Sequence, residues 1–205
     1  MRYVDLRQAL NNFVVFSLRD IRILHPSFAG ARLNEWQKKG YIKKLLRGYY
    51  IFSDLNLNEN VLFHIANKIY SPSYVSLEAA LSSYGLIPES TYVITSASTR
   101  KTYQFKTPIG EFAYRTIRPR MFWGYHLIEW NHRTFRIATP EKALLDYFYF
   151  RPDIKVHDAS ESLRIDRAAF FERISKEQLL SSLDRFGQKS LTRRVSAFLE
   201  FMEHA

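Results

Sequence analysis

The sequence contains no cysteine among its 205 residues. This absence excludes a disulfide scaffold, a cysteine-ligated zinc site and a cysteine nucleophile, and it fits a reducing compartment. The seven glycines are scattered singly, so the chain has no glycine-rich loop for holding a phosphate. The HExxH and GxSxG motifs and paired metal-binding aspartates are also missing, which removes the commonest sequence signatures of hydrolases and metal sites.

Long hydrophobic runs are missing as well. No stretch approaches the roughly 18 uninterrupted apolar residues of a membrane span. The first residues, MRYVDLRQALNNFVVF, carry Asp5 and other polar side chains where a signal peptide needs an apolar run. We therefore expect a cytoplasmic protein with no membrane partner. With 46% hydrophobic and 16% aromatic residues, the chain can still bury substantial cores.

Positive charge is present in excess, with a formal net charge of +10. Residues 1–58 hold 10 Lys and Arg against 4 Asp and Glu, whereas residues 59–205 hold 20 against 16. A basic N-terminal block indicates an anionic partner at that end, with nucleic acid the first choice and an anionic membrane the second. The alternative is that the surplus charge only keeps the protein in solution.

The first 52 residues predict three helices followed by a β-hairpin. An amphipathic helix is expected at Tyr3–Asn12, and a second helix follows Ser17, which forms an approximate capping box with Asp20. The His-Pro-Ser sequence then breaks the chain, because the residue before a proline disfavours helix. A third helix is expected to run from Ser27, as its N-cap, to Gly40.

The predicted hairpin has strands at 41–46 and 49–52 and a turn at Arg47-Gly48. Three helices and a hairpin in this order are typical of a winged helix-turn-helix, which we assign to residues 1–55. At about 100° per residue, one side of the third helix is apolar or small and should pack on the first two helices. That side contains Ala29, Leu33, Trp36 and Gly40.

The opposite side of the third helix is small, polar and basic, and it can enter a DNA major groove about 12 Å wide. Asn34 could read adenine through two hydrogen bonds, and Arg32 or Lys38 could reach guanine or a phosphate. Glu35 could accept a hydrogen bond from cytosine or pair with a neighbouring cation. The candidate DNA-binding residues are Ser27, Arg32, Asn34, Glu35, Lys38 and Lys39 on the helix, and Lys43, Lys44 and Arg47 on the hairpin.

The hairpin cations are expected to contact phosphates, which positions a protein without reading sequence. Strand alternation can turn one of Lys43 and Lys44 away from the DNA. Two alternatives stay open for the whole surface. One is RNA in place of DNA, and the other is an ordinary solvated helix beside a charged edge hairpin that resists aggregation.

Residues 56–73 are interpreted as a connector helix, and residues 74–205 as an α+β domain. A helix is expected between Ser76, as N-cap, and Gly85, and another begins at Thr139-Pro140. Runs rich in β-branched and aromatic residues predict strands at 92–98, 102–106, 111–117, 125–130 and 134–138. Two or three helices should follow, one of them capped by Ser175. The predicted fold class is α+β: a winged helix-turn-helix, then a mostly antiparallel sheet with flanking helices.

Basic residues interleaved with aromatics suggest a second nucleic-acid surface in this domain, because arginine and tyrosine together suit base stacking and phosphate contact. The alternative is an exposed sheet face with ordinary β-forming aromatics. The cations concerned are Arg100, Lys101, Arg115, Arg118 and Arg120.

An enzyme is the competing class of function. A nuclease would need clustered carboxylates near a lysine, and the candidates are Glu111, Glu141-Lys142 and Asp146. Each has a simpler role at the start of a strand or along a helix. His126 and Glu129 should fall on opposite faces of one strand, which disfavours a metal site there. The sequence therefore predicts no catalytic residue, no metal and no cofactor.

Residues 74–149 contain an ordered set of motifs: YVSLEAALSSYGLIPE, YVITSASTRKT, F-TPIGEFAYRTIRP--FWGY and ATPEKALLDYFY. This set, behind a basic winged-helix block, resembles the AbiEi family of antitoxins from type IV toxin–antitoxin and abortive-infection operons. The resemblance implies an N-terminal domain that binds inverted repeats in its own promoter and represses the operon. It also implies a C-terminal domain that opposes a nucleotidyltransferase-like toxin without a stable complex. A stand-alone transcriptional regulator is the remaining alternative.

Overall fold

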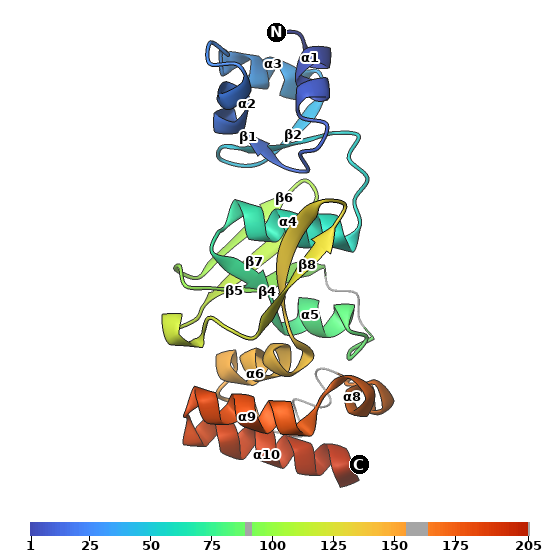
Figure 1. Cartoon of the computed structure of the whole chain (residues 1–205), viewed down its shortest axis with the longest axis vertical. Helices are drawn as coiled ribbons and strands as arrows, with labels where there is room; N and C mark the ends of the chain where they lie inside the picture. Colours follow the sequence, from blue (N-terminus) through green and yellow to red (C-terminus); the bar gives the residue numbers. More distant parts are fainter. Residues whose placement is uncertain (89–91, 155–163, 205) are drawn as a thin grey trace.

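The structure is a computed structural model that describes residues 1–88, 92–154 and 164–204. Its elements form three groups along the long axis of the molecule (Figure 1). Helices on a three-stranded sheet lie at one end, a six-stranded sheet with helices lies in the middle, and the last helices lie at the other end. The predicted α+β class is confirmed at this level.

The N-terminal block, residues 1–52, alternates short helices and strands. Its elements are α1 (Tyr3–Ala9), β1 (Phe16–Ser17), α2 (Leu18–Leu24), α3 (Ala31–Lys38), β2 (Ile42–Leu46) and β3 (Tyr49–Phe52). The strands pair antiparallel in the order β1-β3-β2. The sequence did not predict β1, because two residues are too few to show strand alternation.

Local capping explains where α2 begins, whereas α3 begins later in the sequence than predicted. The Asp20 N–H donates to Ser17 Oγ at 3.3 Å and the Ser17 N–H donates to Asp20 Oδ2 at 2.7 Å, so the predicted capping box is confirmed. The prediction that Ser27 caps α3 is wrong, since Gly30 occupies the N-cap. A Cβ at Gly30 would lie 3.3 Å from Leu18 Cδ2, so the close approach of α2 favours glycine there.

A separate hydrophobic core holds the N-terminal block together and fixes α3 relative to the hairpin. All three helices and all three strands contribute buried side chains to it. They are Leu6, Leu10, Phe16, Ile21, Phe28, Leu33, Trp36, Ile42, Tyr50 and Phe52. Leu45 and Ile51 of the same hairpin belong instead to the core of the middle group. The three-stranded sheet therefore separates the N-terminal helices from the rest of the protein.

The middle group is built on a sheet of six strands in the order β6-β7-β5-β4-β9-β8. The strands are β4 (Ser73–Val75), β5 (Val93–Ser98), β6 (Tyr103–Thr107), β7 (Gly110–Thr116), β8 (Tyr125–Trp130) and β9 (Arg133–Ala138). Three of the five neighbouring pairs are antiparallel, while β5–β7 and β4–β9 are parallel. The sheet is thus more mixed than predicted, and its central strand β4 was not predicted.

Helix α4 (Glu59–Ile69) is part of the core of this group, although its segment was interpreted as a connector. It packs against β4 and β9, and its buried residues are Val61, Phe63, Ile65, Ala66 and Ile69. The Tyr114 hydroxyl on β7 donates to the Ala66 carbonyl at 2.8 Å, and burial raises the pKa of Tyr114. This bond joins α4 to the sheet through a fully buried ring.

The remaining helices pack beyond the sheet and close the other end of the molecule. They are α5 (Leu77–Ser83), α6 (Pro140–Phe150), α8 (Arg167–Arg173), α9 (Lys176–Phe186) and α10 (Lys189–His204), with a 3-10 turn η1 at Pro119–Met121. Thr139 caps α6 and Ser175 caps α9, as predicted. Glu141 accepts a hydrogen bond from the Ser175 N–H at 3.0 Å, which joins α6 to the start of α9.

Candidate nucleic-acid interface

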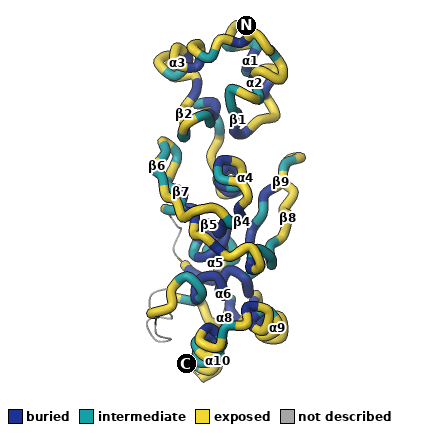
Figure 2. The backbone as a smooth tube through the Cα atoms, turned by 90° about the vertical axis from the view of Figure 1, so that its left-hand side faces the viewer, coloured by how far each residue is buried: buried dark blue, intermediate teal, exposed yellow. Residues whose placement is uncertain are grey.

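Helix α3 presents one buried and one exposed side at the outer end of the molecule (Figure 2). Leu33 and Trp36 are 2% and 4% exposed and pack into the N-terminal core, as the periodicity predicts. Ala29 and Gly40, which were expected on the same buried side, are exposed and lie outside the helix. The outward side of α3 bears no large aliphatic side chain, so it is compatible with a groove of polar base edges.

Polar contacts within α3 and to the chain terminus restrain part of this outward side. Glu35 and Lys39 form an ion pair at 2.7 Å, which lowers the pKa of Glu35 and raises the pKa of Lys39. The Arg32 guanidinium donates to the carbonyl of Met1. The Asn34 side chain makes only a long contact, 3.5 Å from Gln37 Nε2. Asn34 and Lys38 are therefore the least restrained polar side chains of the face.

The hairpin of β2 and β3 turns at Gly48, whose φ of 90° lies in the left-handed region that favours glycine. Lys44 pairs with Tyr50, which faces the N-terminal core, whereas Lys43 pairs with Ile51, which faces the middle group. Because directly paired residues share a face, the two lysines lie on opposite faces of the hairpin. Lys44 is thus better placed than Lys43 to act together with α3.

The predicted interface residues are all exposed at the surface of the N-terminal block. Ser27 lies in the loop before α3, and the others lie on α3, at its end or on the hairpin. Within the described part of the chain, the side chains of Lys38, Lys43, Lys44 and Arg47 have no hydrogen-bond or ion-pair partner. Cations without internal partners at one end of the molecule are free to contact an external anion.

The second basic set is divided between different places. Arg100 lies over the ring of Tyr70, 4.1 Å from its centroid, on the α4 side of the sheet. Arg115 points to the opposite face, where it lines a cavity with Leu77 and Phe150. The other three are exposed, Lys101 between β5 and β6 and Arg118 and Arg120 at η1. The five cations therefore do not share one face of the sheet.

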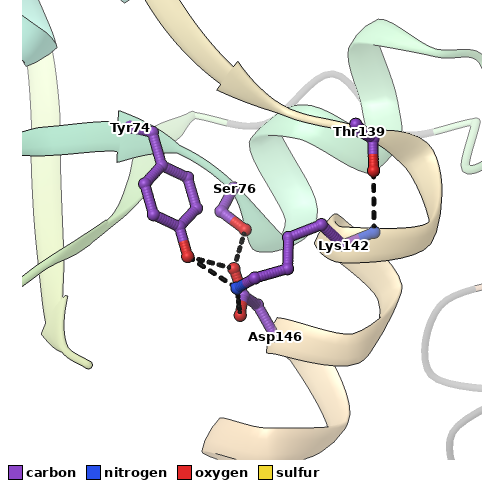
Figure 3. Close-up of polar contacts among 5 residues, drawn as sticks. All are labelled: Tyr74, Ser76, Thr139, Lys142 and Asp146. Atoms are coloured by element: carbon purple, nitrogen blue, oxygen red, sulfur yellow. Dashed lines mark hydrogen bonds and ion pairs between the residues drawn. The ribbon is translucent and has the colours of Figure 1, made fainter. Parts of the chain in front are cut away.

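A buried polar network, which the sequence did not predict, joins β4 to α6 (Figure 3). Asp146 accepts hydrogen bonds from the hydroxyls of Tyr74 and Ser76, both at 2.8 Å, and forms an ion pair with Lys142. Lys142 Nζ also donates to the Tyr74 hydroxyl at 2.7 Å. Ser76 was predicted to cap α5, but it makes no side-chain capping bond because its hydroxyl is used here.

The environment of this network is entirely interior. The side chains of Lys142 and Asp146 are 1% and 0% exposed. Burial lowers the pKa of Lys142, against the opposing effect of Asp146, and burial raises the pKa of Tyr74 well above its usual value. The rings of Trp123 and Phe186 enclose the ammonium at 5.3 and 5.1 Å. The network has no contact with solvent, so its role is to hold the sheet against α6.

The carboxylates considered for a nuclease do not meet in the structure. Glu111 accepts a hydrogen bond from Gln104 across β6 and β7, Glu141 binds the start of α9, and Asp146 is enclosed with Lys142. Among the residues that the structure describes, no three His, Asp or Glu side chains are close enough to hold a metal ion. Each of these carboxylates instead has an identified structural partner.

No protein-family model matches the chain, and no curated protein is significantly similar to it.

No helix within residues 1–88, 92–154 and 164–204 is both long and apolar enough to cross a bilayer.

Proposed function

We propose that the N-terminal block is a winged helix-turn-helix and that the chain is a DNA-binding transcriptional repressor. The observation that carries this proposal is the pairing of an exposed polar helix with an exposed basic hairpin on one small core. The element order and the strand order β1-β3-β2 suit a winged helix, with α3 as the recognition helix and the β2–β3 hairpin as the wing.

In this proposal α3 enters the major groove and the wing lies along the backbone. Asn34 and Lys38, separated by about one helical turn, face the base edges, where the Asn34 amide reads adenine. Lys44 and Arg47 contact phosphates on the flank of the groove. The ion pair of Glu35 with Lys39 supports a positioning role for these two residues, because both charges are already partly satisfied.

We further propose that the repressor is the antitoxin of a type IV toxin–antitoxin operon, bound to inverted repeats in its own promoter. Support comes from the ordered motifs between residues 74 and 149, which resemble AbiEi antitoxins. Its functional partner would be a nucleotidyltransferase-like toxin that it opposes without a stable complex. Cells whose growth is arrested by the product of an adjoining nucleotidyltransferase-like gene should grow again when this chain is co-expressed. If co-expression does not restore growth, the chain is a stand-alone regulator.

Fluorescence anisotropy with labelled duplex from upstream of the gene tests the DNA-binding proposal. The triple variant Lys38→Gln, Lys44→Gln, Arg47→Gln should weaken binding and reduce the salt slope by about 0.9 for each lost phosphate contact. Lys189→Gln, at the far end of the chain on α10, is the matched control and should bind as the wild type does. Equal affinities and slopes for the triple variant and the wild type would refute the assignment.

A further inference from the structure

A cavity of about 440 Å³ lies between the β2–β3 hairpin and the middle group, outside the interface described above. Tyr49 of the hairpin forms one wall, and His64, Asn67 and Lys68 of α4 form another. Ser71, Thr134 and Arg136 complete the polar part of the lining. The cavity therefore collects side chains from separate parts of the chain at the junction of two cores.

The lining has donors and cations but no acid. Lys68 and Arg136 supply two positive charges, and none of the described residues that line the cavity is Asp or Glu. Asn67 Oδ1 accepts from the Arg136 N–H at 2.6 Å, whereas Asn67 Nδ2 is buried and has no hydrogen-bond partner. A buried amide donor without an acceptor is costly, but Nδ2 has almost no accessible surface, so a ligand in the cavity meets the cations of the lining rather than this donor.

We propose that this cavity binds a phosphate group. A phosphate supplies several acceptor oxygens and negative charge, which match the Lys68 and Arg136 cations and the hydroxyl-bearing residues of the lining, Tyr49, Ser71 and Thr134. A cationic ligand would meet two positive charges without a counter-charge, and a neutral apolar ligand would take water from these charges without replacing it. The site thus selects an oxyanion rather than a hydrophobic molecule.

His64 gives the site a measurable link to pH. Its Nδ1 lies 3.0 Å from the Thr134 carbonyl, so Nδ1–H donates to that oxygen. Burial lowers the pKa of His64, which is opposed by the Thr134 hydrogen bond and reinforced by Arg133 and Lys68. The other groups facing it across the cavity are Arg136 and Tyr49. A bound dianion offsets these positive charges, so binding should favour the imidazolium and strengthen as the pH falls.

The phosphate can come from two sources. One is the DNA backbone, because the cavity begins at the hairpin, on the face that carries Lys43. Arg100 also donates to the carbonyl of Ser71, a lining residue, at 3.3 Å, so a further cation flanks the site. The other source is a free phosphate compound. The DNA source rests on the proposed function, whereas the cavity chemistry does not.

Isothermal titration of the full chain with sulfate tests the pocket, because sulfate resembles phosphate and keeps its charge near neutral pH. Asn67→Asp retains the acceptor for the Arg136 N–H and adds a negative charge to the lining, so it should weaken sulfate binding by about tenfold or more. Lys68→Gln, a change at an exposed position that folding should tolerate, should also weaken binding. Lys189→Gln is the control. Wild-type affinity should rise as the pH falls toward and below about 6.5, the ordinary pKa of histidine, and His64→Gln should remove that rise.

Absence of sulfate binding to the wild type, or equal binding by Asn67→Asp, Lys68→Gln and the control, would overturn the proposal. The salt slope of DNA binding by Lys68→Gln then identifies the source. A slope reduced by about 0.9 supports a DNA phosphate in the cavity, and an unchanged slope with sulfate binding intact in the wild type supports a free phosphate compound. If the chain binds no DNA, the proposed function fails while the sulfate titration still decides the pocket.

Discussion

The buried ion pair of Lys142 and Asp146 gives a sharp test of how the middle group is held together. Asp146→Ala removes the counter-ion of Lys142 and the acceptor for the hydroxyls of Tyr74 and Ser76. Leaving one charge of a buried pair unpaired costs about 3–5 kcal/mol, and each stranded hydroxyl adds on the order of 1 kcal/mol. Since domains unfold with only about 5–15 kcal/mol, we expect the melting temperature to fall by on the order of 10–20 °C.

Urea unfolding followed by far-UV circular dichroism measures this loss, and a matched double variant controls for it. Lys142→Met with Asp146→Leu removes both charges and keeps similar volume, so it should be within about 2 kcal/mol of the wild type. Together with the single variants Lys142→Met and Asp146→Leu, this double variant completes a double-mutant cycle, which should give a coupling energy of about 2 kcal/mol or more. If Asp146→Ala unfolds at the wild-type urea midpoint with an unchanged slope, Lys142 and Asp146 do not stabilise the fold as a buried ion pair.

Four further predictions test other parts of the molecule. Asn34→Ala should lose about 1–3 kcal/mol of discrimination at one base pair, and anisotropy against single-base operator variants would measure it; a uniform loss on all DNA would make Asn34 a positioning residue. Phe63→Ala should cost about 3–5 kcal/mol in urea unfolding, because its ring is 2% exposed and packs on Phe135. A fragment of residues 74–205 should be unfolded by circular dichroism while residues 56–205 fold, because α4 contributes to the core; a folded shorter fragment would refute this. His64→Gln should flatten the fall in urea midpoint below about pH 6.5, because burial lowers the pKa of His64 and the unfolded chain binds its proton first as the pH falls.

Elements that depend on neighbouring residues could be predicted from the sequence. The capping box at Ser17, the Thr139 cap and the strands of three hairpins were predicted close to their observed positions, because caps and turns are set by a few consecutive side chains. The start of α3 was missed because its N-cap, Gly30, has no side chain that could form a capping hydrogen bond and so gives no local signal. Strand β4 was missed because it has only three residues, all buried, and therefore shows no alternation.

The candidate interface was predictable for the same local reason. Helical periodicity separates Leu33 and Trp36 from the outward polar residues, and that separation needs no knowledge of the rest of the fold. The positions of Lys43 and Lys44 needed the register of β2 on β3, including the irregularity between Lys44 and Leu46. Sequence alternation indicated that the two lysines diverge, and the register determined which of them faces the N-terminal core.

The burial of Lys142 and Asp146 could not be predicted from neighbouring residues. Their spacing of four residues on one helix predicts an ion pair, but charged residues at such spacing usually lie in water, where the pair contributes little. Burial follows instead from topology: the parallel pairing of Val75 with Ile137 places the chain leaving β9, and hence α6, beside β4. Tyr74 and Ser76 flank Val75, so the same pairing that buries the two charges also supplies their hydroxyl partners. The carboxylate considered as a catalytic group is therefore an interior acceptor because of a strand pair formed by residues more than sixty positions apart in the sequence.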